Sequence, residues 1–586
     1  EIKVYLRGRG WQSVPVFERP TLPLGACLVG PALIVEATGC TVLEPGWTLR
    51  VEPGASLVLT RVPQQPTSLP SGRCERSDPA HSELFRHRFM AIAEQMGERL
   101  RLSSRSVNIR ERLDFSCALF NQRGELVANA PHIPVHLGSM GESVKDLLGQ
   151  IGASQLGPLE PGDTFLTNDP YHGGTHLPDI TAITPVFCDG ADPSFYVASR
   201  GHHVDVGGMT PGSMPSFSSS IADEGLLLRN LLFVRGSALL QADWDALCSA
   251  LPNPPRNPKE LLADLQAQVA ANQAGVDGLR RLVNRVGEDE VQQQMDALQR
   301  QASASVIRLL ERVSDAQFSA ELDDGSQLFV RLTADRKRQK LCVDFTGTSD
   351  QRSDNFNAPL AVTKAAVLYV IRSLIDVDIP LNEGCFAPLE LNVPLGSMLN
   401  PLPPAAVVAG NVEVSQVLCN LLFGAFGVQA ASQGTMNNLS FGNFSCQYYE
   451  TVAGGGGAGE GFRGSTGLQS HMTNSRLTDP EVLEDRYPVR LEEFAFRVGS
   501  GGPGRWSGGD GLVRTLRFLE PMDVSLICGS RRVAPFGLRG GEPGARGRTE
   551  LVHRDGHVQD LPGCTHLQLR AGEAIRLLTP GGGGFG

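Results

Sequence analysis

Apolar residues recur at helical spacing in several stretches of the chain. Residues 82–102 carry them at the i, i+3, i+4 spacing of a single helix face, which predicts a long amphipathic helix. Residues 258–314 are rich in Gln, Leu and Ala and have no proline after Pro258, so they predict the clearest helical region. Shorter apolar runs at 364–376 and 415–426 predict buried helices.

Alternation of apolar and polar residues marks the strands. Residues 1–62 alternate between Pro/Gly turns, which is typical of short antiparallel strands. Residues 114–128 predict a strand, a turn and a second strand, and residues 320–345 alternate again around a hairpin turn at Asp323 to Gly325. The pattern therefore predicts both helices and sheets in one large body.

The last third of the chain is rich in glycine, in clusters at 454–457, 499–504, 508–511 and 540–541. Such clusters can cradle phosphate, but none follows the P-loop pattern that ends in Gly-Lys-Ser/Thr. We expect mainly tight turns in a β-rich region, because turns with positive φ are the ordinary use of glycine.

A polar, proline-rich stretch at 63–80 predicts a linker. The expected organisation is a small β unit at 1–62 and a main body at 81–586. The predicted fold class is α+β: a large mixed α/β body, a small N-terminal β unit and a Gly-rich, β-dominated C-terminal region. The chain opens at Glu1 in strand-like sequence, so we expect a fragment of a longer protein.

Composition narrows the class of protein. The chain has 52 Lys and Arg against 63 Asp and Glu, a net charge of −11, and no basic stripe, which argues against nucleic acid or an anionic membrane as partner. Its 12 cysteines include no Cys-x-x-Cys pair, as in proteins with reduced cytosolic thiols. No apolar run reaches the roughly 18–20 residues of a membrane span. We expect a soluble, cytosolic protein.

One short region concentrates the side chains that bind divalent metals. The spacing His-x-x-Asp occurs twice, at His176/Asp179 and His202/Asp205, and glycines flank both copies. Each copy would offer one nitrogen and one oxygen to a shared ion, on loops that follow strand-like runs at 164–167 and 195–198. Alternatively, the histidines only stabilise their loops. The spacing alone does not decide between a metal site and this structural role.

Several longer motifs carry a family resemblance. They lie at 112–120, 130–138, 168–180, 198–203, 211–215, 433–438, 448–454, 471–474 and 579–584. Together they resemble the hydantoinase B/oxoprolinase family from about Asp78 to the last residue. Residues 30–36 and 41–47 are similar to the tail of the companion hydantoinase A subunit.

This fusion resembles the single-chain members of the family, which open 5-oxo-L-proline to L-glutamate with hydrolysis of ATP in the glutathione (γ-glutamyl) cycle. The resemblance implies an enzyme, with this chain as its C-terminal portion and 5-oxo-L-proline as substrate. It places ATP on an upstream hydantoinase A-like half and implies a homodimer. It also assigns the hydrolytic step to the B-type body, whose metal ligands would be His176, Asp179, His202 and Asp205.

Nitrogen and oxygen ligands without thiolate suit Mn²⁺, Mg²⁺, Zn²⁺ or Fe²⁺. Asp169 and His203 are the next candidates, as supporting or alternate ligands, and with Asp114 they form the expected catalytic group.

A second group of polar residues consists of Asn129, His132 and His136. These residues are predicted either to bind substrate or to tie down their loop, and the two roles carry similar weight. The flanking Pro131 and Pro134 argue against a helix that would place both histidines on one face.

Two other functions stay open. The B-type motifs also occur in hydantoinase B and acetone carboxylase subunits, but those belong to multisubunit assemblies and lack the fused tail. A non-catalytic fragment without its ATP-binding half is the second alternative. The retained carboxylates and histidines argue against decay of the site.

Overall fold

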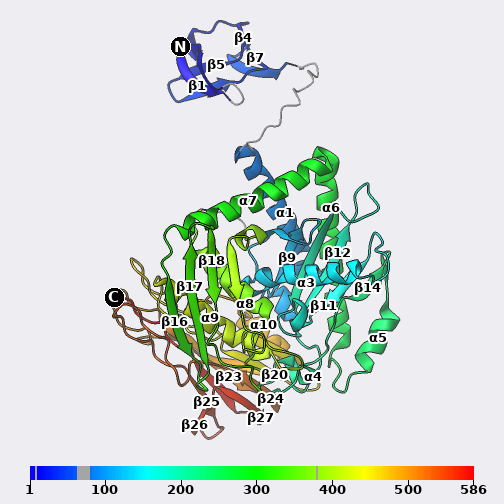
Figure 1. Ribbon diagram of the computed structural model, residues 1–586, viewed down its shortest axis with the longest axis vertical. Helices are drawn as coiled ribbons and strands as arrows, with labels where there is room; N and C mark the ends of the chain where they lie inside the picture. The colour runs from blue at the N-terminus through cyan, green and yellow to red at the C-terminus, as the bar shows by residue number, and fades with distance from the viewer. Residues whose placement is uncertain (7–9, 63–78, 378–380) are drawn as a thin grey trace. The chain divides into compact units, whose positions relative to one another are not determined.

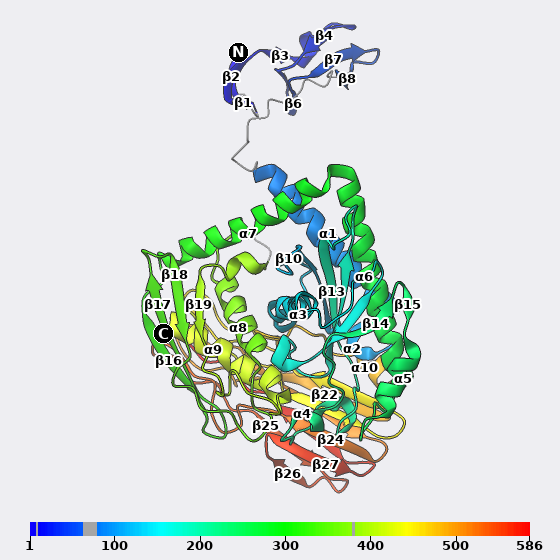
Figure 2. The same ribbon diagram turned by 45° about the vertical axis from the view of Figure 1, so that its right-hand side comes forward.

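The computed structural model describes residues 1–6, 10–62, 79–377 and 381–586. They form two compact units, Glu1–Ser77 and Asp78–Gly586, which Figures 1 and 2 show in two views. The linker predicted at 63–80 falls almost wholly on residues 63–78, which lie outside the described residues.

Short strands build the N-terminal unit, in the sheets β1-β2, β3-β5-β6 and β4-β7-β8. The strands are β1 (Ile2–Leu6), β2 (Gly10–Val14), β3 (Val16–Glu18), β4 (Cys27–Val29), β5 (Ala32–Glu36), β6 (Gly39–Leu43), β7 (Trp47–Glu52) and β8 (Ser56–Arg61). Ile34, Leu43 and Leu49 are buried in its small core. Pairing is antiparallel as predicted except between β3 and β5, which are parallel. Alternation assigns faces to a strand but carries no information on its direction.

The first sheet of the larger unit has the order β10-β9-β13-β12-β11-β14-β15, with antiparallel neighbours throughout. Its strands are β9 (Phe115–Phe120), β10 (Leu126–Asn129), β11 (Thr164–Thr167), β12 (Asp179–Val186), β13 (Phe195–His202), β14 (Leu231–Arg235) and β15 (Ala238–Leu239). They include the strand, turn and strand predicted at 114–128 and both strand-like runs before the histidine motifs.

Helices cover both faces of this sheet, because alternate residues of its strands are apolar on opposite sides. On β9, Cys117 and Leu119 join the core with α1 (Pro79–Ser103) and α6 (Pro258–Val286). Ala118 and Phe120 face the opposite side and join the core with α3 (Pro134–Gly152). Figure 2 shows α3 and α6 on the two sides of β13.

The predicted long helices are confirmed by α1, α6 and α7 (Glu288–Leu310). Gly287, with a φ of +92°, separates α6 from α7. The expectation of no helix near His132 and His136 was wrong for His136, since α3 begins at Pro134 and contains it. Proline is well tolerated at the first helical position because its missing N–H has no partner there in any case.

A second sheet, β16-β17-β18-β19, packs against one helix, which packs in turn against another. The strands are β16 (Ala316–Glu321), β17 (Gln327–Asp335), β18 (Lys340–Asp344) and β19 (Leu389–Asn392), and the two helices are, in that order, α9 (Ser415–Phe426) and α8 (Leu360–Ser373). The predicted hairpin turn joins β16 to β17, whose register pairs Glu321 with Gln327. A π-helical turn, Gly410–Val414, leads directly into α9. The remaining helices are α2 (Val107–Arg110), α4 (Ile221–Glu224), α5 (Gln241–Ser249) and α10 (Pro480–Arg486).

Two further sheets form the β-dominated C-terminal region, in the orders β21-β20-β24-β27 and β22-β23-β28-β25-β26. Their strands are β20 (Asn438–Gly442), β21 (Gln447–Thr451), β22 (Val489–Arg497), β23 (Gly511–Phe518), β24 (Met522–Ile527), β25 (Arg548–Val552), β26 (Val558–Leu561), β27 (Cys564–Leu569) and β28 (Ala574–Leu578). Phe441 of one sheet and Leu516 of the other share a core.

Most glycines of the predicted clusters do not sit in turns with positive φ. A Cβ on Gly455 would lie 2.0 Å from the Gly509 oxygen, and a Cβ on Gly582 would lie 1.9 Å from the Gly456 oxygen. The Gly509 N–H donates to the Gly456 oxygen at 2.9 Å. Residues 454–457, 501–511 and 581–584, here called the glycine bundle, therefore pack backbone against backbone. Tight turns were the wrong expectation for them, since glycine serves here to permit close approach.

The described chain is a mixed α/β fold in which helices and strands contribute comparably, which confirms the predicted fold class. Across the described ranges, no helix has the length and apolar character needed to cross a membrane.

Candidate metal centre

Two neighbouring strands bring the histidine motifs together. β12 begins at Asp179 and β13 ends at His202, and because the strands are antiparallel, their register pairs these two residues. His176 precedes β12 by one short turn, in which the Asp179 N–H donates to the His176 oxygen at 3.1 Å. The register and this turn thus place the three side chains together at one end of the two strands.

The three side chains converge closely enough to share an ion. His176 Nε2 lies 3.2 Å from His202 Nδ1, and His202 Nδ1 lies 3.0 Å from Asp179 Oδ1. One ligand atom from each of His176, Asp179 and His202 lies within 4.8 Å of the others. Atoms bound to one metal at roughly 2.0–2.2 Å must lie within about 4.4 Å of one another, and the separations of 3.2 Å and 3.0 Å meet that limit.

His136 joins this group from helix α3. Its Nε2 lies 3.2 Å from Asp179 Oδ2, and its Nδ1 lies 3.4 Å from the Ser116 hydroxyl. His136, like His176 and His202, is almost wholly buried. The sequence-based assignment put His136 with substrate-binding residues, whereas the structure sets it beside the carboxylate that the other two histidines share.

Burial and neighbouring charge decide the protonation of the cluster. Burial raises the pKa of Asp179, but the adjacent His136 and His176 outweigh it and leave that pKa well below the usual range. Burial lowers the pKa of His176, only partly opposed by Asp179. An ionised carboxylate beside neutral imidazole is the form in which these side chains bind metals.

A small cavity opens onto the cluster. It has a volume of about 20 Å³ and is lined in part by Asp114, His136, His176, His202 and Asn411. That volume admits one water molecule or one ion. His202 Nε2 is buried without a hydrogen-bond partner among the described residues. A buried polar atom without a partner beside such a space fits a bound ion or water.

Three contacts fix the orientation of the ligand side chains. The Thr175 hydroxyl donates to Asp179 Oδ2 at 2.6 Å. The ring of His202 stacks on Tyr449, with centroids 4.6 Å apart and planes at 21°. Asn411, on the π-helical turn, contacts His176 Nδ1 through its amide nitrogen.

Arg200 ties the surrounding loops to the sheet. It is fully buried on β13, and its guanidinium donates to Thr181, to Ser139 and Ser143 of α3, and to the Gly173 oxygen. Burial lowers its pKa to about 10. These bonds hold α3 and the loop before His176 in a fixed position relative to β13.

The structure does not bring Asp205 to the cluster. Its carboxylate pairs with Arg256 at 3.0 Å and accepts the N–H groups of Gly207 and Gly212. His203, the neighbour of His202, has Nε2 2.9 Å from the Gln268 amide oxygen. Asp169 lies 2.7 Å from His172 Nδ1 and accepts the Tyr171 N–H. These side chains have partners of their own away from the three-residue cluster.

The predicted substrate-binding residues are also separated: His136 joins the metal cluster, whereas His132 and Asn129 do not. His132 Nδ1 accepts the Cys117 N–H at 3.0 Å, its ring lies against Phe115, and burial lowers its pKa to about 4. Asn129 donates to the Ala130 oxygen. Neither lines the small cavity, whereas Asp114 does, 3.8 Å from Arg112. His132 and Asn129 thus have the contacts of residues that tie down a loop.

Thr175, Asn411 and Tyr449 were missed as contributors. Thr175 and Tyr449 lie inside motifs that carried the family resemblance, so a signal was present for them. Asn411 lies 235 positions from His176 with no motif around it.

Known proteins resemble this chain in sequence and in fold. The chain is 43% identical over its whole length to 5-oxoprolinase 1 of Arabidopsis thaliana and 41% identical to 5-oxoprolinase of Dictyostelium discoideum. It spans about half the length of both, 47% and 46%. Among solved structures, the ATP-dependent caprolactamase of Pseudomonas jessenii has the same fold, with a TM-score of 0.77 at 24% identity over 87% of this chain and 91% of that one.

The sequence model of the hydantoinase B/oxoprolinase family matches residues 78–586, a range that includes the strand ends and the helix that build the cluster. The sequence motifs, the fold and the relatives agree, and the chain belongs to the hydantoinase B/oxoprolinase family.

Proposed function

We propose that this chain forms the hydrolytic half of an ATP-dependent enzyme that opens 5-oxo-L-proline to L-glutamate. The observation that carries the proposal is the convergence of His176, Asp179 and His202 in a chain whose relatives are named 5-oxoprolinases. We further propose that this cluster holds a divalent metal, Mn²⁺, Mg²⁺, Zn²⁺ or Fe²⁺.

The reaction needs two activities. The five-membered amide of 5-oxoproline resists hydrolysis, so a phosphoryl group from ATP is first placed on the amide oxygen, which makes the ring carbon open to attack. Water then adds to that carbon and the ring C–N bond breaks, which frees the amine and leaves an acyl phosphate, and a second water hydrolyses the acyl phosphate to glutamate and phosphate. We assign ATP to a hydantoinase A-like half and the water step to this chain.

A bound divalent metal would supply a Lewis acid and lower the pKa of water. The chain's own residues prepare the site for it. Asp179 orients His176 and His202, while the low pKa of His176 keeps its imidazole neutral. Asp114 lines the same cavity and is the group we assign to take a proton from the attacking water. A homodimer in the cytosol stays part of the same prediction.

The test is an assay of glutamate and ADP release from 5-oxo-L-proline and ATP, with the chain alone and with a hydantoinase A-like polypeptide supplied in trans. We expect no turnover by the chain alone and turnover with both halves. ADP release by the purified chain alone would overturn the division of roles.

Two matched substitutions test the cluster itself. Asp179→Asn keeps shape and removes charge, so metal content and turnover should both fall. Asp205→Asn is the control, because Asp205 belongs to the same His-x-x-Asp pattern but pairs with Arg256. Equal metal content in the two variants, measured by elemental analysis, would contradict the assignment.

A further inference from the structure

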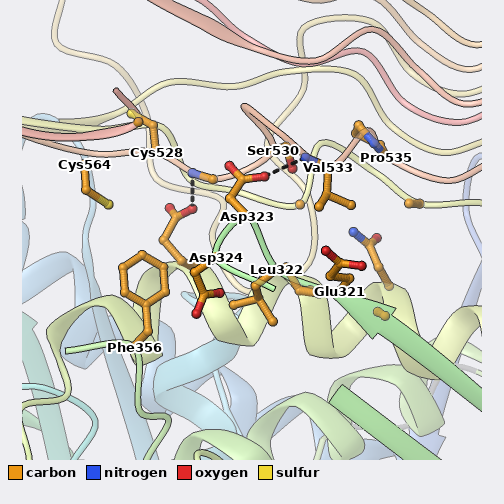
Figure 3. Close-up of a pocket in the computed structure, with 18 of the residues that line it drawn as sticks. Glu321, Leu322, Asp323, Asp324, Phe356, Cys528, Ser530, Val533, Pro535 and Cys564 are labelled. Atoms are coloured by element: carbon orange, nitrogen blue, oxygen red, sulfur yellow. Dashed lines mark hydrogen bonds between the residues drawn. The ribbon is translucent and has the colours of Figure 1, made fainter. Parts of the chain in front are cut away.

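A cavity of about 490 Å³ lies apart from the histidine cluster, in the larger unit. Figure 3 shows Glu321, Leu322 and Asp324, from the end of β16 and the turn after it, across the space from Val533 and Pro535. The lining also includes Glu413 of the π-helical turn and Val417 of α9. Its volume is that of a pocket for a small molecule, typically about 300–1,000 Å³.

The walls are largely apolar and aromatic. Phe217, Phe318, Phe356 and Phe536 all line the cavity. The Phe217 side chain is 59% exposed, so the cavity reaches solvent beside it. Rings around a space of this size favour a ligand with an apolar body, because removing its surface from water is favourable.

The polar part of the lining carries an excess of negative charge. It includes the carboxylates of Glu321, Asp323, Asp324 and Asp354, whereas burial raises the pKa of Glu413, also in the lining, to about 7. Arg352 pairs with Asp324 and Asp354, and Arg532 pairs with Glu321. Asp323 instead accepts backbone N–H groups. The walls therefore disfavour a carboxylate or phosphate ligand, such as 5-oxo-L-proline or ATP.

We propose that this cavity binds a small organic cation, an aryl or alkyl body that carries an ammonium or amidinium group. The body contacts the phenylalanine walls, and the cationic group donates toward the carboxylates of the lining. This site does not depend on the proposed ring-opening function, and it has a charge preference opposite to that of the anionic substrate.

The probe is phenethylamine, which is a cation at neutral pH. Hydrocinnamate, with the same ring and chain length, is the matched anion, and phenethyl alcohol is the matched neutral compound. Binding to the 586-residue chain is measured by calorimetry and by ligand-observed NMR. We expect phenethylamine to saturate the protein with a Kd below about 5 mM and at least about tenfold below that of hydrocinnamate.

Three variants locate the bound probe. Val417→Trp projects an indole ring into the cavity and should abolish binding, and Phe217→Ala removes an exposed wall and should weaken it. Asp354→Asn should raise the Kd, because it removes one of the carboxylates of the lining. Val498→Trp is the control, since Val498 is 87% exposed and outside the cavity. Its affinity should equal that of the parent chain.

Metal content at the histidine cluster should be unchanged in Phe217→Ala, which separates this site from the proposed catalytic one. Equal affinity for cation and anion would overturn the proposal, as would the absence of saturable binding. Retained binding in a folded Val417→Trp, with no loss in Phe217→Ala, would place the probe elsewhere and also overturn it.

Discussion

His176 Nε2 and His202 Nδ1 lie 3.2 Å apart although 26 positions separate them in the chain. The contact comes from the register of β12 and β13, which pairs Asp179 with His202, together with the short turn that places His176 before β12. Two imidazole nitrogens this close, beside one ionised carboxylate, supply three ligand atoms that can bind one metal ion.

The first prediction follows from this shared ion. His176→Ala and His202→Ala should each weaken metal binding at least about tenfold, and the double variant should be scarcely worse than either single one, because residues that act as a unit are not additive. Equilibrium dialysis with elemental analysis measures the effect. His203→Ala, a neighbour bonded to Gln268, is the matched control and should retain the metal. Fully additive losses would contradict a shared ion.

The second prediction concerns the Thr175 hydroxyl, which donates to Asp179 Oδ2. Thr175→Val keeps the shape of the side chain and removes the donor, so the carboxylate is held less firmly. We expect metal affinity to fall by about 10–100-fold, the usual effect of losing a bond that supports a ligand. Thr164→Val removes another buried hydroxyl of the same sheet, bonded to Thr184, and should leave affinity unchanged. Equal affinities in the two variants would refute the role.

The third prediction is a pH dependence that arises at Glu224. This residue is fully buried, Oε1 accepts from Ser218, Val407 and Val408, and Oε2 has no partner among the described residues. Burial raises its pKa from 4.5 to about 7. Below a pH of about 4.5 the Glu224 carboxyl is protonated in both the folded and the unfolded state. As pH rises toward 7 the unfolded state loses the proton first, so stability falls.

The expected loss at Glu224 is about 3 kcal/mol, complete above a pH of about 7. Glu224→Gln keeps the acceptor and cannot ionise, so its advantage over the parent chain should grow from a pH of about 4.5 to about 7.5. Denaturant unfolding at several pH values measures this difference. Glu94→Gln, at an exposed position, is the control. An advantage that is the same at every pH would contradict the assignment.

The fourth prediction concerns the glycine bundle. Gly582→Ala places a Cβ 1.9 Å from a backbone oxygen, so strands of backbone must separate. We expect destabilisation of about 2 kcal/mol or more, seen as a lower Tm. Gly149→Ala is the matched control, because nothing lies within 4 Å of its Cβ and it sits in helix α3. It should be neutral or stabilising by about 0.5–1 kcal/mol. Similar Tm values for the two variants would refute the packing argument.

Local patterns predicted much of the fold. The helices α1, α6 and α7 followed from apolar spacing, and the hairpin between β16 and β17 followed from Asp-Asp-Gly. The start of α3 at Pro134 was not predicted, because proline was taken as a helix breaker when its position at the first turn made it compatible.

The candidate site could be predicted only in part. Both His-x-x-Asp motifs looked equivalent in sequence, but β12 and β13 end where Asp179 faces His202. Asp205 lies past the strand, where the chain turns at Gly207 and Gly208 with positive φ. Register and chain direction therefore separate the two aspartates. The contact from Asn411 depends on the packing of a distant turn, which no local pattern encodes.

The glycine bundle also has a consequence for how related sequences should be compared. Its glycines touch neither the histidine cluster nor the larger cavity, yet almost any side chain there would collide with backbone. Selection would retain them in every descendant that still folds, whatever reaction that descendant catalyses. Invariance at these positions would record an ancestral packing constraint and carry no information about substrate.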